Sequence, residues 1–366
     1  MFIKKLMLLN YRNYKNVNID FSRNVNVFMG DNAQGKTNIL ESIYYCGLAK
    51  SHRTSKDREL INWNEDGAYI SLNIGKERLD KRIDINILKD GKKAIKVNSI
   101  KINKIGELFG TFNVVMFSPE DLKIIKESPG IRRRFIDMEL CQINNRYYYN
   151  LVQYNKVLNE RNTLLKNRKI TDDMLDIYDE QLVNFGEYIV NERLKYIEKL
   201  NYYGAEIHKD ITLNKENIVY IYISSIKEFN NNINDEFKEK FRSCLIKNRK
   251  RDKEKGITTV GPHRDDFMVL INNIDTKSYG SQGQQRTAVL TMKFSSLKII
   301  KEITGEYPVL LLDDVLSELD FNRKKYILST INNIQTIITC TGISDICEYL
   351  DNESKIFKVQ EGHISS

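Results

Sequence analysis

The first part of the chain has two kinds of hydrophobic spacing, one typical of strands and one typical of helices. Short, mainly apolar runs at Val25–Met29 and at 113–117 are typical of buried strands, and the alternation at 83–87 predicts a half-buried strand. Between 38 and 47 the apolar residues recur three and four positions apart, which predicts a helix directly after the first run. Residues 1–125 are therefore expected to form mixed α/β structure.

Helical spacing predominates from 130 to 209. Apolar and tyrosine side chains recur at helical intervals over 147–158 and again over 178–197. The polar stretch 166–172 between them has cations at the end of the first helix and Thr and Asp caps for the second. The pattern predicts an antiparallel helical hairpin.

A mixed pattern returns after the hairpin. We expect a strand at 218–223, a helix at 233–248 and a loop in the basic segment Lys247–Lys255. Beyond it, the spacing predicts a helix at 281–300 and strands at 267–271, 309–314 and 336–339.

Composition narrows the class of protein. The 366 residues carry a net charge of +8, which favours a polyanionic partner, although a solubilising surface would explain it equally well. Apolar runs are too short to span a membrane, and the N-terminus has no signal-peptide pattern. The five cysteines are odd in number and widely spread, so we expect reduced thiols and a cytoplasmic protein.

A glycine-rich loop stands between the first predicted strand and helix. Backbone N–H groups of such a loop surround a phosphate, and the dipole of the following helix favours its charge. The lysine would contact β- and γ-phosphates, and the threonine would bind Mg²⁺. The loop predicts an ATP site formed by Gly30, Asp31, Asn32, Ala33, Gln34, Gly35, Lys36 and Thr37.

An apolar run, Val309–Leu312, ends in two aspartates. On its own this pattern also fits a buried parallel strand followed by a helix cap. Together with the glycine-rich loop it predicts that Asp313 holds Mg²⁺ and that Asp314 activates the attacking water.

Ser281-Gln282-Gly283-Gln284 fits a capping box at the start of an amphipathic helix. A capped helix N-terminus with a small glycine is also a second anion site. We expect both roles. Because this motif cannot easily reach the glycine-rich loop within one subunit, Ser281 and Gly283 would complete the ATP site of a second copy.

The order of these three motifs resembles the ABC-type ATPase heads of SMC and Rad50 proteins. Finer matches resemble the RecF family of bacterial recombination mediators over essentially the whole chain. They are 30–38, Phe117-Ser118-Pro119-Glu120-Asp121-Leu122, Pro129-Gly130-Ile131-Arg132-Arg133-Arg134-Phe135 and Gly261-Pro262-His263-Arg264-Asp265-Asp266.

The resemblance implies an α/β fold, a P-loop ABC-type ATPase domain with a helical inserted lobe. We expect a first ATPase segment at 1–125, the helical insertion at 126–255 and a second ATPase segment at 256–366. Arg12 and Asn38 join the expected nucleotide contacts.

The resemblance also implies a function. It suggests an ATP-dependent homodimer that clamps duplex DNA near single-strand gaps, works with RecO and RecR, and serves recombinational repair and replication-fork maintenance. Weak, DNA-stimulated ATP hydrolysis would release the DNA.

Three departures from general ABC heads predict slow turnover. Asp314 replaces the usual longer glutamate, Glu120 stands where a glutamine is common, and Thr339-Cys340-Thr341 replaces a switch histidine. Two alternatives remain open at this stage. One is a nucleotide-binding subunit of another ABC-type assembly, and the other is an ATP-binding module with vestigial hydrolysis.

Several cations are candidates for DNA contact. Three arginines in the first turns of a helix oppose its dipole, so either an acidic neighbour or DNA phosphates must offset them. The candidates are Arg132, Arg133, Arg134, Arg53 and Lys250. His263 and Arg264 beside two aspartates fit structural ion pairing better than a metal cluster.

Overall fold

The computed structural model describes all residues except 168–169, 227–235, 343–346, 348–349, 351 and 366. The chain divides into two compact units. The first contains Met1–Asp121, Lys209–Asn214 and Leu290–Ser366, and the second contains Leu122–His208 and Lys215–Val289. Each unit is described by itself.

The first unit contains a six-stranded, mainly parallel sheet with the order β15-β14-β3-β13-β12-β8. Four of its strands are buried on both faces, which explains why their sequences are mainly apolar and do not alternate. Only β15 is antiparallel to its neighbour. The strands are β3 (Val25–Met29), β8 (Val114–Phe117), β12 (Val309–Asp313), β13 (Thr336–Cys340), β14 (Lys355–Gln360) and β15 (His363–Ser365).

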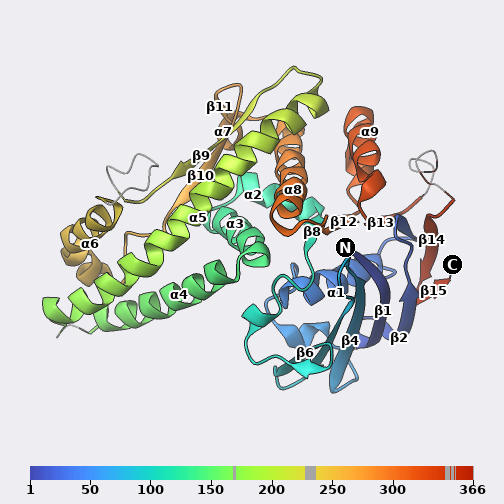
Figure 1. The fold of residues 1–366 in the computed structure, drawn as a ribbon, viewed down its shortest axis with the longest axis horizontal. Coiled ribbons are helices and arrows are strands. Elements are labelled where there is room, and N and C mark those ends of the chain that lie inside the picture. Colours follow the sequence, from blue (N-terminus) through green and yellow to red (C-terminus); the bar gives the residue numbers. More distant parts are fainter. Residues whose placement is uncertain (168–169, 227–235, 343–346, 348–349, 351, 366) are drawn as a thin grey trace. The chain divides into compact units, whose positions relative to one another are not determined.

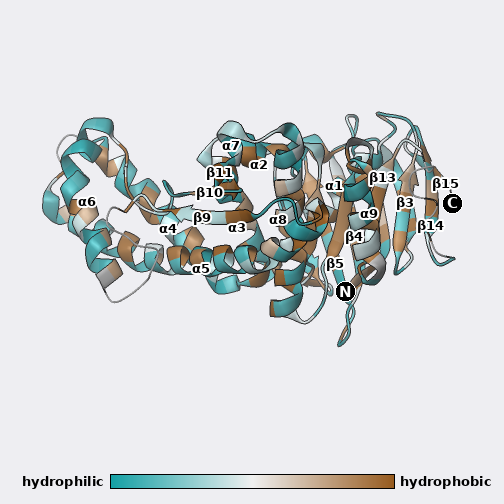
Figure 2. Ribbon diagram, turned by 90° about the horizontal axis from the view of Figure 1, so that it is seen from above, coloured by the Kyte–Doolittle hydropathy of each residue, from teal (hydrophilic) through white to brown (hydrophobic). Residues whose placement is uncertain are grey.

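A second, antiparallel sheet of the first unit has the order β2-β1-β4-β5-β6-β7. Its apolar residues join those of helix α1 (Lys36–Leu48) and of the parallel sheet in one core, with Leu8, Ile43 and Leu311 among its members. Figure 2 shows hydrophobic residues along β3, β4 and β5. The strands are β1 (Phe2–Tyr11), β2 (Tyr14–Asp20), β4 (Gly67–Gly75), β5 (Lys81–Leu88), β6 (Lys93–Val97) and β7 (Ile100–Lys101).

Short helical elements complete this part of the chain. Helix α9 (Phe321–Thr330) begins at Asp320, whose carboxylate accepts a hydrogen bond from the backbone N–H of Arg323. The 3-10 helices are η1 (Asp57–Leu60), η2 (Ile105–Glu107), η3 (Pro119–Leu122), η4 (Leu316–Glu318) and η5 (Ile331–Asn333).

The second unit combines helices with a small antiparallel sheet of order β11-β10-β9 (Figure 1). The sheet consists of β9 (Ile218–Ile223), β10 (Asp266–Ile271) and β11 (Ile274–Asp275). Two long helices, α5 and α8, have their C-terminal ends in the first unit. The helices are α2 (Lys123–Lys126), α3 (Pro129–Ile143), α4 (Asn145–Leu165), α5 (Asp172–Thr212), α6 (Glu236–Lys255), α7 (Thr276–Tyr279) and α8 (Gln282–Thr304).

A fully buried arginine joins three helices of the second unit. Arg161 of α4 donates to Asp179 of α5 at 2.7 Å and to Asp252 of α6 at 2.8 Å. Both carboxylates are almost completely buried as well. Removing one member of such a group would leave an uncompensated buried charge, so the group fixes α6 against the predicted hairpin of α4 and α5.

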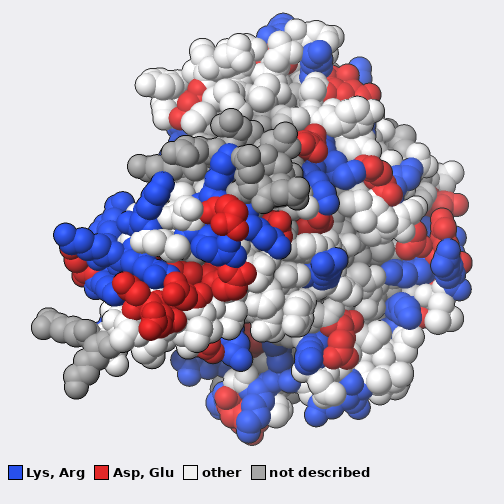
Figure 3. Space-filling view, turned by 60° about the vertical axis from the view of Figure 1, so that its left-hand side comes forward, with Lys and Arg blue, Asp and Glu red and all other residues white. Residues whose placement is uncertain are grey.

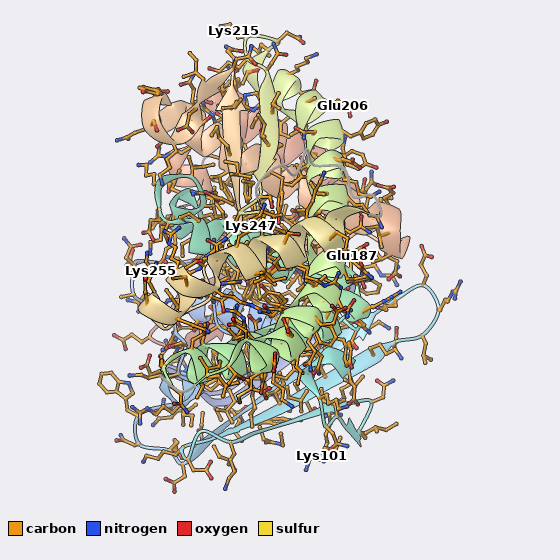
Figure 4. All side chains as sticks on the ribbon, turned by 90° about the vertical axis from the view of Figure 1, so that its left-hand side faces the viewer. Lys101, Glu187, Glu206, Lys215, Lys247 and Lys255 are labelled. Atoms are coloured by element: carbon orange, nitrogen blue, oxygen red, sulfur yellow. The ribbon has the colours of Figure 1, made fainter. Side chains whose placement is uncertain are left out.

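The basic segment at 247–255 is helical, and the expected loop is wrong. Figure 4 shows Lys247 and Lys255 on the same helix, α6, which is mostly hydrophilic in Figure 2. Arg249 of this helix pairs with Asp176 and Asp179 of α5, and Lys253 donates to Asp172 at 2.7 Å. These long-range ion pairs stabilise a helix that its own hydrophobic pattern does not predict. The start of the expected helix, 233–235, lies outside the described residues.

The division into units also differs from the expected boundaries. The sequence assigned 256–366 to the second ATPase segment, but residues 256–289 belong to the second unit. The reason is strand pairing, since β10 follows the whole length of β9 in antiparallel register from Asp266↔Ile223 to Ile271↔Ile218.

Candidate nucleotide-binding site

The glycine-rich loop connects β3 to α1, as the sequence predicted. Gly35 precedes the helix with φ 113°, a backbone conformation that favours glycine, and a Cβ there would lie 2.5 Å from Asn13 Nδ2. At Gly30 a Cβ would lie 2.3 Å from the carbonyl oxygen of Val359. No described side chain caps the start of α1. Both glycines are therefore required by local geometry, and the helix N-terminus is suited to an anion.

The side chain of Lys36 folds back over the loop. Its ammonium donates to the carbonyl oxygens of Gly30 at 2.5 Å and of Asp31 at 2.9 Å. The loop residues Asp31, Asn32 and Ala33 are exposed, whereas Lys36 is buried. A buried cation beneath an exposed loop is a suitable partner for phosphate oxygens.

Thr37 and Asp313 meet across the first unit. The Thr37 hydroxyl donates to Asp313 Oδ1 at 2.9 Å, and the Thr339 hydroxyl donates to the same oxygen at 2.9 Å. The parallel pairing of β12 with β13 places Asp313 opposite Thr339. Hydroxyl and carboxylate oxygens are ligands that Mg²⁺ accepts in phosphate sites, so this donor set fits the predicted metal role of Thr37 and Asp313.

Asp314 lies in the turn directly after β12. Its φ is 53°, in the left-handed region that Asp tolerates better than most residues, and its N–H donates to the Thr339 hydroxyl at 2.9 Å. Ser317 Oγ donates to the Asp314 carbonyl at 2.8 Å. The tight turn places the second carboxylate just beyond the end of the strand that carries Asp313.

A buried glutamate that the sequence did not single out organises the start of α1. Glu41 accepts two hydrogen bonds from Arg12, at 2.9 and 2.7 Å, and one from Ser51 at 2.6 Å. Burial alone would raise the pKa of Glu41, but the hydrogen bonds from Arg12 and Ser51 outweigh it and keep the pKa below its ordinary value. Arg12, predicted as a nucleotide contact, is therefore held by a carboxylate of the same unit.

Arg53 reaches the first turn of α1. Its Nη1 donates to Asn38 Oδ1 at 2.9 Å, and Asn38 Nδ2 donates to Asn13 Oδ1 at 2.8 Å. The structure thus brings together Arg12, Asn38 and Arg53, which the sequence had assigned partly to nucleotide and partly to DNA.

The C-terminal hairpin also contacts the glycine-rich loop, which sequence reasoning missed. In the turn between β14 and β15, the N–H of Glu361 donates to Gln34 Oε1 at 2.5 Å and the N–H of Gly362 donates to the Gln34 carbonyl at 3.4 Å. Asn13 Nδ2 donates to the same carbonyl at 3.0 Å. The glycine at 362 offers a turn signal in the sequence, but nothing in the sequence indicates that this turn contacts Gln34.

The predicted capping box is present at the start of α8. The N–H of Ser281 donates to Gln284 Oε1 at 2.9 Å, and the N–H of Gln284 donates to Ser281 Oγ at 3.2 Å. Gln284 Nε2 also donates to Glu216 at 2.8 Å. Ser281 and Gly283 belong to the second unit, whereas the glycine-rich loop belongs to the first.

The three consecutive arginines of α3 have different environments. Arg132 is buried and forms two hydrogen bonds with Asp266, at 2.7 and 2.8 Å, while Arg133 donates to the Asp265 carbonyl at 2.6 Å. Arg134 is exposed. The acidic neighbour that the sequence left open is therefore Asp266 for Arg132, and Arg134 is the member available to an external phosphate.

The His263–Asp266 segment forms contacts within the protein. His263 Nδ1 lies 2.7 Å from the Tyr154 hydroxyl, and Asp265 Oδ2 accepts a hydrogen bond from the Tyr222 hydroxyl at 2.6 Å. Among the described residues, no group of His, Cys, Asp and Glu has the arrangement of a metal site. The expected ion pairing is found for Asp266, which pairs with Arg132, whereas His263 and Arg264 contact the Thr258 carbonyl.

Lys250 is exposed on α6. On the face seen in Figure 3, basic and acidic side chains are interspersed and do not form one continuous basic surface. Over the part of the chain that is described, no helix has the length and hydropathy needed to cross a bilayer.

Comparison with known proteins decides the family. Residues 2–365 match the model of the RecF/RecN/SMC N-terminal domain. The chain is 71% identical to a protein named DNA replication and repair protein RecF from Clostridium botulinum strain Eklund 17B, over 100% of this chain and 99% of that protein. This chain belongs to the RecF family. The resemblance inferred from the motifs is confirmed, and the alternative of another ABC-type assembly is not supported.

Other RecF proteins and structures agree. The RecF of Clostridium perfringens strain SM101 is 68% identical over 100% of this chain and 99% of its own length. A solved structure titled as the recombination mediator RecF with ATP in the RecFOR pathway is 40% identical, with a TM-score of 0.91 over 100% of this chain and 98% of that one. An Smc head domain from Pyrococcus furiosus, 17% identical with a TM-score of 0.57 over 100% of this chain and 95% of that one, shares the fold. The α/β ATPase-head fold expected from the sequence is confirmed.

Proposed function

We propose that this chain is an ATP-dependent DNA-binding protein of recombinational repair and replication-fork maintenance. ATP binding joins two copies into a clamp on duplex DNA near single-strand gaps, and slow hydrolysis releases it. The observation that carries the proposal is the contact of Thr37 with Asp313 at the end of a complete phosphate-binding loop. The RecF relatives, whose names refer to DNA replication and repair, support the assignment of the process.

The residues of one subunit bind and orient ATP. The loop Gly30–Thr37 surrounds the β-phosphate, and the Lys36 ammonium exchanges its carbonyl partners for phosphate oxygens. Thr37 and Asp313 would hold Mg²⁺, which when bound neutralises charge on the β- and γ-phosphates. Asp314 accepts a proton from the attacking water. Arg12 and Asn38 position the loop.

The second copy completes the site. The partner's Ser281 and Gly283, at the capped start of α8, approach the γ-phosphate. Because a bound triphosphate then contacts both copies, the dimer exists only while ATP is present. In this arrangement bound ATP holds the two copies together on DNA, and ATP hydrolysis separates them and releases the DNA.

Slow turnover is the behaviour we expect of the residues at the carboxyl ends of β12 and β13. The carboxylate of Asp314 is one methylene shorter than a glutamate, and a tight turn fixes its backbone through the Thr339 hydroxyl. Thr339 and Cys340 offer no imidazole, and burial raises the pKa of the Cys340 thiol to about 11, so the thiol is neutral at physiological pH. Because the site has a short carboxylate and no imidazole at 339 and 340, it hydrolyses ATP slowly, and the dimer stays closed on DNA while ATP is bound.

The pathway of related RecF proteins supports the partners that we propose. Those structures describe RecF in the RecFOR pathway, and we propose RecO and RecR as partners of this chain. Double-stranded DNA and its junctions with single strands are the proposed nucleic-acid substrates, and the cytoplasm is the proposed compartment.

Sedimentation tests the proposal most directly. The full chain should sediment as a monomer without nucleotide or with ADP, and as a dimer with Mg-ATP, more strongly when duplex DNA is added. A monomer under every condition would contradict the clamp. ATP turnover measured with and without DNA separates the proposal from an ATP-binding module with vestigial hydrolysis, which would dimerise but show no DNA-stimulated turnover.

A further inference from the structure

The single tryptophan of the chain lies almost wholly in solvent. Trp63 is 94% exposed, whereas tryptophan side chains in folded proteins are highly buried on average. It lies in the connection between α1 and β4, in the same unit as the glycine-rich loop. A single exposed apolar side chain is ordinary on a protein surface. The backbone that holds this indole and the cleft beside it are therefore the features that bear on its role.

The turn that carries Trp63 is well held. The N–H of Asn62 donates to the Asn10 carbonyl at 2.9 Å, and the N–H of Glu65 donates to the Asn62 carbonyl at 3.0 Å. Asn10 Nδ2 donates to Glu65 Oε2 at 3.1 Å, which closes the turn against β1. The indole is therefore presented by an ordered backbone, which reduces the entropy cost of binding a planar ligand.

A cleft of about 510 Å³ lies beside the ring. Its lining includes Trp63 and three cations, Arg12, Arg58 and Lys89. The volume lies within the ordinary range for small-ligand sites. A flat aromatic surface next to cations is the combination that binds a nucleobase and its phosphates.

The cleft is lined by charges of both signs. Glu59 accepts a hydrogen bond from Thr54 at 2.6 Å and Glu65 accepts one from Asn10 at 3.1 Å, both carboxylates keep their charge, and Arg12 is paired with Glu41. Attraction for a phosphate therefore depends on Arg58 and Lys89. Arg58 is exposed and forms no ion pair with any described residue, as is also true of Lys56, two positions earlier in the chain. The exposed pair Lys89–Asp66, at 3.6 Å, is weak enough to yield to a phosphate.

We propose that Trp63 stacks on an unpaired nucleobase of the bound DNA, while Arg58, Lys56 and Lys89 contact the adjoining phosphates. The ligand class is the single-stranded side of a duplex junction, because a base within a duplex does not expose its face. The inference rests on the proposed DNA-binding function and extends it, since it supplies a reason for a preference for gapped over continuous duplex.

Intrinsic fluorescence gives a direct test because Trp63 is the only tryptophan. With Mg-ATP present, a gapped duplex or a short oligothymidine should quench the emission, and a blunt duplex of equal length should leave it unchanged. Quenching by ATP alone, with no further change on adding the gapped duplex, would assign the ring to the nucleotide and overturn the proposal.

Affinity measurements separate this inference from the underlying function. Trp63→Ala should weaken binding to the gapped duplex about tenfold, as expected when one stacked base no longer meets the ring, and leave blunt-duplex binding unchanged. Trp63→Phe should recover most of the affinity, and Tyr202→Ala, which removes an exposed aromatic of α5, should have no effect. Normal binding of both DNAs by Trp63→Ala would refute the stacking role alone. Failure of the unaltered chain to bind either DNA would refute the proposed function.

Discussion

Thr37 and Asp313 are 276 positions apart in the chain, yet the Thr37 hydroxyl donates to Asp313 Oδ1 at 2.9 Å. The contact joins the first turn of α1 to the carboxyl end of β12. It brings together the two oxygen donors that we assign to Mg²⁺.

Thr37→Val tests this assignment. The substitution keeps the branched shape of the side chain but removes the oxygen, so Mg-ATP affinity should fall about tenfold or more, as expected when a charged group is deprived of one polar partner. The measurement is nucleotide binding at varied Mg²⁺. Thr304→Val is the matched control, because that hydroxyl bonds to backbone groups near the end of α8, the carbonyls of Ile300 and Glu306 and the N–H of Glu306. Equal Mg²⁺ dependence in both variants would contradict the metal role.

Asp314→Asn should trap the closed state. The amide keeps the size of the side chain and tolerates the left-handed backbone, but it cannot accept a proton from water. We expect hydrolysis to fall about 100-fold while Mg-ATP still binds, so that dimers persist on DNA. Turnover and the rate of DNA release after dilution measure the effect. Faster release than that of the unaltered chain would show that Asp314 has another role.

Ser281→Arg should abolish the ATP-dependent dimer. A bulky cation at the start of α8 would occupy the space through which the partner's γ-phosphate contacts this helix. Ser281→Ala serves as the control, since it removes the same cap at a cost of about 1 kcal/mol but leaves the space open. Sedimentation with ATP should show monomers for the arginine variant and dimers for the alanine variant. Dimers in both cases would mean that the site is not shared.

Substitutions at two arginines of α3 should have different effects, one on the stability of the fold and the other on DNA affinity. Arg132→Ala leaves Asp266 without its partner and should lower the free energy of unfolding by about 3 kcal/mol. Arg134→Glu alters an exposed side chain and should not change the melting temperature. It should weaken DNA binding for all sequences, and the slope of log affinity against log salt should become shallower by about 0.9 for each phosphate that is no longer neutralised. Unchanged DNA affinity in the Arg134 variant would remove α3 from the DNA surface.

The second unit should lose stability in mild acid because of His263. Burial, reinforced by the nearby cations Arg264, Arg133 and Arg193, lowers the pKa of His263 to about 4. Between its unfolded pKa of about 6.5 and this value the unfolded chain binds a proton that the folded chain does not, so stability falls as pH falls.

From pH 7 to pH 5 this decrease in stability amounts to about 2 kcal/mol. Urea unfolding at the two pH values measures it. His263→Gln is the control and should show a smaller change, because its amide does not titrate. An equal change in both proteins would assign the pH dependence to other groups.

Local sequence determined the parts of the site that lie next to each other in the chain. The strand, glycine-rich loop and helix at 25–48 follow from an apolar run, two glycines in special backbone positions and helical spacing. The two aspartates at the end of β12 and the capping box of Ser281 were equally clear. Each depends on interactions within a few residues, which pattern and propensity describe well.

The tertiary structure alone decided the long-range relationships. The contact of Glu361 with Gln34 spans 327 positions, and the pairing of Arg249 with Asp176 and Asp179 makes a helix of a segment that looks like a basic loop. The sequence did not indicate a role for Glu41, because a carboxylate on a helix is usually exposed to solvent. Its burial and its ion pair with Arg12 are visible only in the folded structure. These features depend on which elements pack together, and hydrogen bonds and ion pairs across such distances leave no periodic signal along the chain.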